Sequence, residues 1–225
     1  MCGRFVLAVD PADLEASFVG IELPPAGAIQ PRYNIAPTQP VAVITNSAER
    51  KLEFFNWGLI PSWAKDPKIG NRMINARAET LAEKPSFRAA YKRRRCLIPT
   101  NGFYEWQRHH DSKTKTPMFI SLTSGKPFAF AGLWESWHSS ESDHVLSCTI
   151  ITTTPNELME PIHNRMPVIL SAEAYDVWLA PGEQSGAKMQ SLLAPYPATE
   201  MQAYAISTFV NSPSNDSPEC ILPVN

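Results

Sequence analysis

The stretch Val145-Leu-Ser-Cys-Thr-Ile-Ile-Thr-Thr153 decides the fold class, because β-branched and apolar residues fill almost all of its positions. Such residues favour a β-strand, and Pro155 and Asn156 end the run soon afterwards. Seven further runs have the same character and are bounded by proline, glycine, asparagine or serine: Val41–Thr45, Leu52–Trp57, Cys96–Pro99, Phe103–Trp106, Met118–Leu122, Phe128–Leu133 and Tyr204–Thr208.

Helices are predicted to be few, because 21 prolines are spread through the chain and proline interrupts helices. Three segments suit helices, with Asp10 and Ser171 as N-caps of the first and third: Pro11–Phe18, Ser86–Arg94 and Ala172–Leu179. Three others are predicted as a surface loop, an irregular tail and an edge strand, in that order: Ser136–Ser142, Asn211–Pro218 and Cys220–Val224. The sum is a single α+β domain over residues 1–225, built on a mainly antiparallel, barrel-like β-sheet with flanking helices.

The composition is that of an ordinary globular protein, with 225 residues, 44% hydrophobic and 19% charged. A net charge of −2 excludes a global basic field for attracting nucleic acid. The apolar run between Arg4 and Asp10 is too short for a signal peptide, and no stretch is long enough to span a bilayer. We therefore predict a cytoplasmic protein whose four scattered cysteines are free thiols, with no metal site.

Cys2 becomes the first residue once Met1 is removed, as methionine aminopeptidases generally do before a small residue. It then carries an α-amine with a pKa of about 7.7–8.0 and a partly ionised thiol with a pKa near 8.5. Such an aminothiol attacks an aldehyde twice, giving a Schiff base and then a thiazolidine ring. Taken alone, Cys2 is better explained as merely a small second residue. Gly3 favours the reactive interpretation, because it lets a ligand approach the backbone.

Asn75 and Arg77 lie in the stretch Ile74–Thr80, of sequence INARAET. A neutral amide such as that of Asn75 holds a backbone group or an amine without adding charge, and an arginine grips phosphate bidentately. A capped turn with a surface arginine explains the same residues equally well.

Glu105 lies in the stretch Asn101–Trp106, of sequence NGFYEW. Strand alternation puts Phe103 and Glu105 on one face, and Tyr104 and Trp106 on the other. Desolvation in such surroundings raises the pKa of a carboxyl towards neutrality, which suits a general acid or base. The alternative is a carboxylate on the exposed face of an edge strand.

His163 lies in a proline-bounded segment, Pro161–Pro167, of sequence PIHNRMP. The prolines predict a rigid loop, in which an imidazole would exchange a proton with the ring oxygen of a deoxyribose. A purely structural histidine is the alternative.

Aromatic and basic residues give weaker signals for nucleic acid. Trp63 follows a Pro-Ser turn and suits stacking on a base, worth roughly 1–3 kcal/mol, whereas Trp57 suits the core. The basic run Lys92–Arg95 is predicted to be a solvated helix end and is left out of the site.

In their order and spacing, six stretches together resemble the SRAP family, the SOS-response-associated peptidase-like proteins. They are MCGRF (residues 1–5), RYNIAP (32–37), WGLIP (57–61), INARAET (74–80), GFYEW (102–106) and HNRMP (163–167). The combination is highly specific, although each piece is weak alone. The resemblance implies one SRAP-like domain over 1–225, or 2–225 without Met1, with a barrel-like β fold.

The resemblance also implies roles for individual residues. Cys2 matches the nucleophile that crosslinks to DNA, Asn75 the residue that orients it, Glu105 the acid/base, and His163 the helper in sugar ring opening and crosslink reversal. The implied DNA contacts are Arg4, Asn34, Trp63, Arg77 and Arg165.

The implied partner is single-stranded DNA with abasic sites, at replication forks or 3′ junctions. The implied role is in DNA repair, within the DNA damage and SOS response. The protein would act as a monomer, without metal or cofactor, and would shield the abasic site by forming a thiazolidine crosslink with little turnover. Lyase-type and autoproteolytic, peptidase-like activities are included in this expectation, as is a cytoplasmic or nucleoid location.

Two other classes of function remain open. An N-terminal-nucleophile cysteine amidohydrolase or peptidase would use the amine as base and the thiol to attack an amide. A non-covalent single-stranded DNA binding module would use the aromatic residues and arginines alone.

Overall fold

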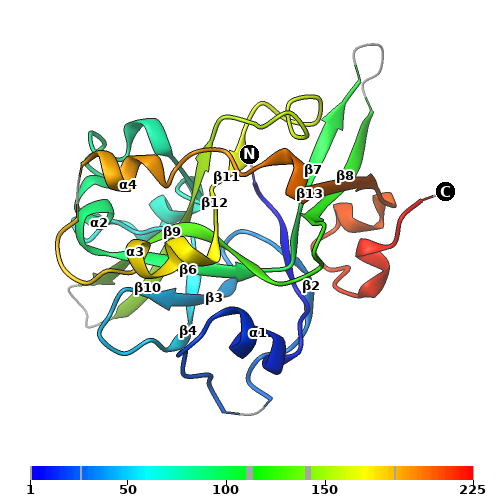
Figure 1. Ribbon diagram of the computed structural model, residues 1–225. Coiled ribbons are helices and arrows are strands. Elements are labelled where there is room, and N and C mark those ends of the chain that lie inside the picture. Colours follow the sequence, from blue (N-terminus) through cyan, green and yellow to red (C-terminus); the bar gives the residue numbers. More distant parts are fainter. Residues whose placement is uncertain (1, 26, 110–113, 140–142, 185, 225) are drawn as a thin grey trace.

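The computed structural model describes residues 2–25, 27–109, 114–139, 143–184 and 186–224. Two mainly antiparallel β-sheets with short helices around them form an α+β fold, and one sheet closes into a barrel (Figure 1). The predicted fold class is thus confirmed. Met1 and residues 140–142 of the predicted serine-rich loop lie outside the described residues.

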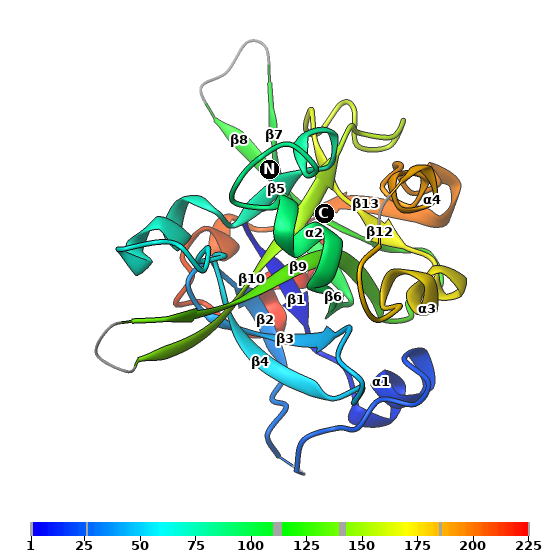
Figure 2. The same ribbon diagram turned by 90° about the vertical axis from the view of Figure 1, so that its left-hand side faces the viewer.

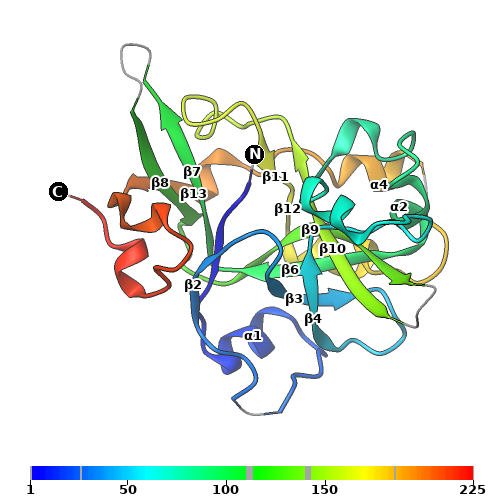
Figure 3. The same cartoon turned by 180° about the vertical axis from the view of Figure 1, so that it is seen from behind.

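The barrel is closed by five strands in the order β10, β4, β3, β6, β9 and back to β10. Within this ring the β10–β4 pairing is parallel and the others are antiparallel; Figure 3 shows β3, β4 and β10 from behind. Three short strands extend the sheet: β5 and β11 pair with β10, and β12 pairs with β9. The bounds are β3 Pro40–Thr45, β4 Leu52–Trp57, β5 Asn75–Arg77, β6 Arg95–Thr100, β9 Phe128–His138, β10 His144–Thr153, β11 Met166–Pro167 and β12 Ile169–Leu170.

The second sheet has the order β13-β8-β7-β1-β2. Its strands are β1 Phe5–Leu7, β2 Arg32–Ile35, β7 Gly102–Arg108, β8 Lys115–Leu122 and β13 Met201–Ala205. Phe5 of β1 packs edge-on against Trp57 and Phe130 of the barrel, with ring centroids 5.2 and 5.8 Å apart. These aromatic contacts join the two sheets in one hydrophobic core.

The helices are short and lie around the sheets (Figure 2). Asp10 accepts a hydrogen bond from the amide of Ala12, so the predicted N-cap is confirmed. Ser171 does occupy an N-cap position, but its hydroxyl bonds the Glu173 carboxylate and caps no backbone group. The bounds are α1 Pro11–Ser17, α2 Arg88–Arg93, α3 Tyr175–Trp178 and α4 Ala187–Ser191, with 3-10 turns at Pro67–Arg72, Ala78–Thr80, Ala172–Ala174, Ala198–Glu200, Thr208–Asn211 and Pro218–Ile221. No described helix is long and apolar enough to cross a membrane.

Each of the predicted strands overlaps an observed one, and Leu52–Trp57 matches at both ends. The edge strand predicted at Cys220–Val224 is wrong, because Cys220 and Ile221 belong to a 3-10 turn and Pro223 makes just an isolated bridge. Ser136 to His138 extend β9, so this part of the predicted loop is also wrong. The strands that the sequence did not predict, such as β1 and β5, are too short to show a period of two.

Arg95 departs from the predicted solvated helix end, because it is fully buried. Its guanidinium donates to backbone carbonyls at and beyond the ends of α2 and α3. The acceptors are Tyr91 (3.2 Å), Lys92 (2.5 Å), Trp178 (2.9 Å), Ala180 (2.5 Å) and Gly182 (3.3 Å). One arginine thus satisfies carbonyls that helix ends leave unpaired.

We expect Arg95→Met to lower the free energy of unfolding by about 3 kcal/mol, because several buried carbonyls lose their donor. Arg93→Met is the matched control, since Arg93 is exposed and makes a long contact of 3.4 Å with Glu183. Urea denaturation of both variants and the wild type measures the difference. Equal small losses in the two variants would contradict the structural role of Arg95.

Candidate active site

The four residues predicted to carry chemistry come from four separate segments of the chain. Cys2 precedes β1, Asn75 begins β5, Glu105 lies within β7, and His163 lies in the turn before β11. Pairing of β1 with β7 brings the first and third segments together. Pairing of β5 and β11 with β10 brings the other two to the same end of the barrel.

Cys2 is fully buried and is held through its backbone. The Asn75 side-chain Nδ2 donates a hydrogen bond of 2.8 Å to the carbonyl oxygen of Cys2. The Asn75 Oδ1 atom is buried and has no hydrogen-bond partner among the residues that the structure describes. The amide therefore fixes the backbone of Cys2 and presents an acceptor that is still available.

The ionisation of the Cys2 thiol differs from the sequence-based expectation of a partly ionised group. Burial, and secondarily the negative charge of Glu105, raise the pKa of this thiol far above its ordinary value. The thiol is therefore protonated at neutral pH, and it needs a base to react. The four cysteines are free thiols and buried, as predicted for their redox state.

Glu105 is 3% exposed, which contradicts the alternative of an exposed edge-strand carboxylate. The predicted alternation is confirmed, since Phe103 belongs to the main core whereas Tyr104 and Trp106 pack in a separate cluster on the other face. Burial raises the pKa of Glu105 to about 7, opposed by the positive amino terminus. A carboxyl with this pKa accepts and donates protons at neutral pH.

His163 faces the same carboxyl, with its Nε2 atom 4.0 Å from Oε2 of Glu105. On the other side of the ring, the backbone amide of Arg165 donates to Nδ1 over 3.1 Å. Burial, followed by the charge of the amino terminus, lowers the pKa of His163. The imidazole is therefore held mostly neutral beside Glu105.

A cavity of about 530 Å³ opens beside His163, which is the one of the four residues that lines it. Its walls are contributed by the end of β7 and by the segment that precedes β11: Trp106, Arg108, His109, Glu160, Pro161, Ile162, His163 and Asn164. Among the described residues, no group of three histidine, cysteine or carboxylate side chains is arranged to hold a metal ion.

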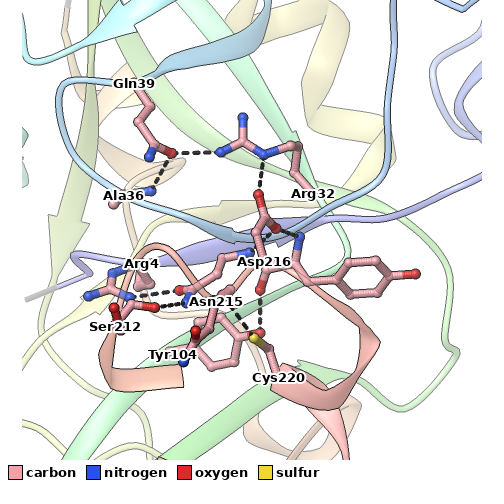
Figure 4. Close-up of polar contacts among 11 residues, drawn as sticks. Arg4, Arg32, Ala36, Gln39, Tyr104, Ser212, Asn215, Asp216 and Cys220 are labelled. Carbon is pink, nitrogen blue, oxygen red and sulfur yellow. Dashed lines mark hydrogen bonds and ion pairs between the residues drawn. The ribbon is translucent and has the colours of Figure 1, made fainter. Parts of the chain in front are cut away.

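Arg4 and Asn34, both predicted DNA contacts, lie in a hydrogen-bonded network with the C-terminal segment. Figure 4 shows Arg4 beside Ser212 and Asn215 of that segment. Asn34 is fully buried, accepts from Arg4 over 2.7 Å, and donates to three carbonyls of residues 210–215. Asp216 fastens the same segment by accepting from the backbone amide of Asn34 and from Arg32. The Asn34 amide thus has no surface to offer a strand, and its observed role is to hold the fold.

Arg4 keeps some exposure and has two further links. It donates to the carbonyl of Val210 over 2.9 Å, and its guanidinium lies 5.6 Å from the ring centroid of Trp106. Because Trp106 lines the cavity, the positive charge of Arg4 lies against one of the cavity's wall residues, although Arg4 itself does not line the cavity.

The remaining predicted DNA contacts differ in exposure. Trp63 is 57% exposed, while the neighbouring Ala64 carbonyl is fixed by a hydrogen bond from Trp137. Arg77 is exposed at the end of β5. Arg165 is mostly covered and forms a bidentate ion pair with Glu79, with N–O distances of 2.6 and 3.0 Å.

Sequence reasoning missed Glu79, although it lies in the quoted stretch INARAET. An acidic residue two positions after Arg77 gives no local signal, because its partner Arg165 is far away in the chain. Trp106 and Arg108 were also given no role, and they line the cavity beside His163. Strand alternation puts Trp106 on the face opposite Glu105, and its place in the cavity wall depends on the distant segment that precedes β11.

A family model and two named relatives match this chain over nearly its whole length. A family model described as SOS response associated peptidase (SRAP) matches residues 1–213. The abasic site processing protein YoqW of Bacillus subtilis is 53% identical over 222 residues, covering 98% of this chain and 99% of its own. The abasic site processing protein HMCES of Xenopus tropicalis is 30% identical, covering 100% of this chain and 78% of its own.

The fold is also similar to that of solved structures. A crystal structure of a protein from Bacteroides thetaiotaomicron matches with a TM-score of 0.89 and 29% identity, covering 100% of both chains. A second, from Bordetella bronchiseptica, matches with a TM-score of 0.76 and 25% identity, covering 92% of this chain and 100% of the other.

We expect Glu105→Gln to be more stable than the wild type near pH 8, with the difference vanishing at low pH. The folded protein holds a proton on Glu105 up to about pH 7, whereas the unfolded chain releases it near its ordinary pKa of 4.5. The wild type therefore loses stability as the pH rises between these values, by up to about 3 kcal/mol. Urea denaturation from pH 4 to pH 8 measures this, and parallel curves for the two proteins would contradict the burial argument.

Proposed function

Because this chain belongs to the SOS response associated peptidase family, we propose that it recognises abasic sites in single-stranded DNA and shields them. The relatives YoqW and HMCES bear the name abasic site processing protein. In the proposed reaction, both the amine and the thiol of Cys2 bond to the aldehyde of the ring-opened sugar, which gives a thiazolidine crosslink. Removal of Met1 is the enabling step, because a peptide bond would otherwise occupy the amine.

One observation carries the proposal: Cys2 is fastened by Asn75 beside a carboxyl whose pKa is near 7. A cysteine that only fills space in the core has no use for an amide side chain such as that of Asn75, which binds the Cys2 carbonyl and keeps its own oxygen free to accept a hydrogen bond. The free Asn75 Oδ1 suits a hydrogen bond from the α-amine of the mature chain.

The reaction balances without an oxidant or reductant. The neutral amine attacks the C1′ aldehyde, and the resulting carbinolamine loses one water molecule to give an imine. Glu105 first accepts the proton released by the nitrogen and then donates it to the departing hydroxyl. The thiol next adds across the imine: the sulfur bonds to C1′, and its proton passes through Glu105 to the ring nitrogen.

Ring closure protects the strand for an electronic reason. An imine at C1′ withdraws electrons, which favours β-elimination of the 3′ phosphate and strand cleavage. The thiazolidine carbon is saturated, so this electron sink is gone. In the proposal His163, whose Nε2 lies 4.0 Å from Oε2 of Glu105, exchanges a proton with the sugar ring oxygen during opening.

For the DNA path, Trp63 and Arg77 enter the proposal as direct contacts, since both are exposed. Trp63 stacks on a base and Arg77 contacts a phosphate. Arg4 contributes a positive charge beside Trp106 through the partly exposed edge of its guanidinium. Asn34 is left out because it is buried.

We expect the mature wild type to form a heat-stable adduct with abasic single-stranded DNA on a denaturing gel, and Cys2→Ala to form none. Cys2→Ser retains the amine and should yield an adduct after borohydride reduction, because an imine forms but the ring does not close. Cys220→Ser is the control for general thiol loss, with adduct formation at the wild-type level. An adduct of normal yield in Cys2→Ala, or none in the wild type, would contradict the proposal.

We expect Trp63→Ala to weaken non-covalent binding of single-stranded DNA by about 5- to 100-fold, corresponding to the loss of one stacked base. Fluorescence anisotropy with the Cys2→Ala protein as background separates binding from crosslinking. Phe54→Ala removes another exposed aromatic, 45% exposed and without a predicted contact, and should bind normally. Equal affinities for both variants would remove Trp63 from the interface.

A further inference from the structure

Glu79 and Arg165 form a contact that the proposed reaction has not used. The two carboxylate oxygens of Glu79 accept from Nη1 and Nη2 of Arg165, and Nη2 also donates to the carbonyl of Thr152 over 2.6 Å. The Arg165 side chain is 14% exposed and the Glu79 side chain is 47% exposed, so the guanidinium is mostly covered while solvent reaches the pair from the carboxylate. Three bonds to two segments thus fix the guanidinium, and they anchor the turn that contains His163.

The backbone of Arg165 offers His163 both a donor and an acceptor. Its amide lies 3.1 Å from Nδ1 and its carbonyl oxygen lies 3.3 Å from the same atom. When Nδ1 is unprotonated it accepts from the amide, and when it is protonated it donates to the carbonyl. One ring orientation therefore serves both protonation states, with Nε2 directed towards Glu105.

We propose that Glu79 is a positioning residue, which fixes Arg165 so that its backbone holds the His163 ring through both protonation states. This inference rests on the proposed function, in which His163 exchanges a proton with the sugar. A ring that keeps its place transfers a proton without a rotation, and so without the entropy cost of finding the reactive geometry again.

Several other groups act on His163 and are unchanged by a substitution at Glu79. They are Glu105 and Arg108 on β7, Lys115 at the start of β8, and the amino terminus. The expected effect of Glu79 is therefore on the orientation of the ring, through Arg165.

Arg165 itself was predicted to contact phosphate, which is a different role for the same pair. If Glu79 holds Arg165 ready for DNA, its loss changes the affinity for any strand. If Glu79 positions His163, its loss changes the reaction with the abasic sugar and leaves the affinity for an intact strand nearly constant.

The test uses Glu79→Gln, with Glu83→Gln as the matched control. Glu83 is exposed in the same segment, so the control makes the same change of charge four residues away. Glu79→Asp keeps the carboxylate and should recover part of the loss. Three quantities are measured for each protein: the single-turnover rate of adduct formation, the affinity for an intact strand, and the ¹⁵N spectrum of the His163 ring, assigned with His163→Gln.

For Glu79→Gln we expect an about ten-fold slower reaction, a partial loss of acid–base catalysis, and an affinity for the intact strand within about two-fold of wild type. The His163 ring nitrogens should show an altered tautomer balance in the free protein. Glu83→Gln should match the wild type in all three measurements.

Two results would overturn the inference: a normal rate with an unchanged His163 spectrum, or a loss of rate matched by an equal loss of affinity for the intact strand. If Glu79→Gln does not fold, Glu79→Asp is compared with the wild type and Glu83→Gln in the same three measurements, with a smaller loss of rate expected and the same two results overturning the inference. The spectrum of free protein needs no DNA, so it tests Glu79 even if the wild type forms no adduct, which would overturn the proposed function separately.

Discussion

The antiparallel pairing of β1 with β7 is the constraint on which the site depends. It draws the first residues of the chain into the core, where Phe5 packs against the barrel and Cys2 is fully buried. The same pairing puts Phe103 opposite Phe5. Because the strands are antiparallel, Glu105, two residues beyond Phe103, lies level with the residues that precede Phe5. A free chain start would be mobile, whereas this one is fixed at its backbone by Asn75.

Burial then sets the chemistry of both acidic groups in the same direction. It raises the pKa of Glu105 to near neutrality and raises that of the Cys2 thiol much further. The thiol is thus kept protonated next to a carboxyl that can take its proton. The site therefore holds no standing thiolate at neutral pH, so any reaction of the sulfur must be accompanied by transfer of its proton.

The contacts of individual arginine side chains show why the net charge is a poor guide to the partners of this protein. Arg95 satisfies carbonyls at helix ends, Arg165 is paired with Glu79, and Arg32 is paired with Asp216. These cations are used within the fold. The positive charge available to a strand is therefore local, as at the exposed Arg77, and a chain of net charge −2 can still present it.

The sequence by itself determined the long strands, the N-cap at Asp10, and the shared face of Phe103 and Glu105, because period-two alternation and capping are local. It left open whether that face exposes Glu105, and the structure shows the side chain to be buried. The sequence also identified four candidate catalytic residues, Cys2, Asn75, Glu105 and His163. Only the tertiary structure decided that Arg95 and Asn34 are buried, that Glu79 anchors Arg165, and that β1 and β5 exist at all. Arg95 bonds Trp178, 83 positions away, Asn34 bonds Val210, 176 positions away, and Glu79 bonds Arg165, 86 positions away. The strands β1 and β5 depend on pairing with strands already in place, and neither kind of contact leaves a periodic trace in the residues that make it.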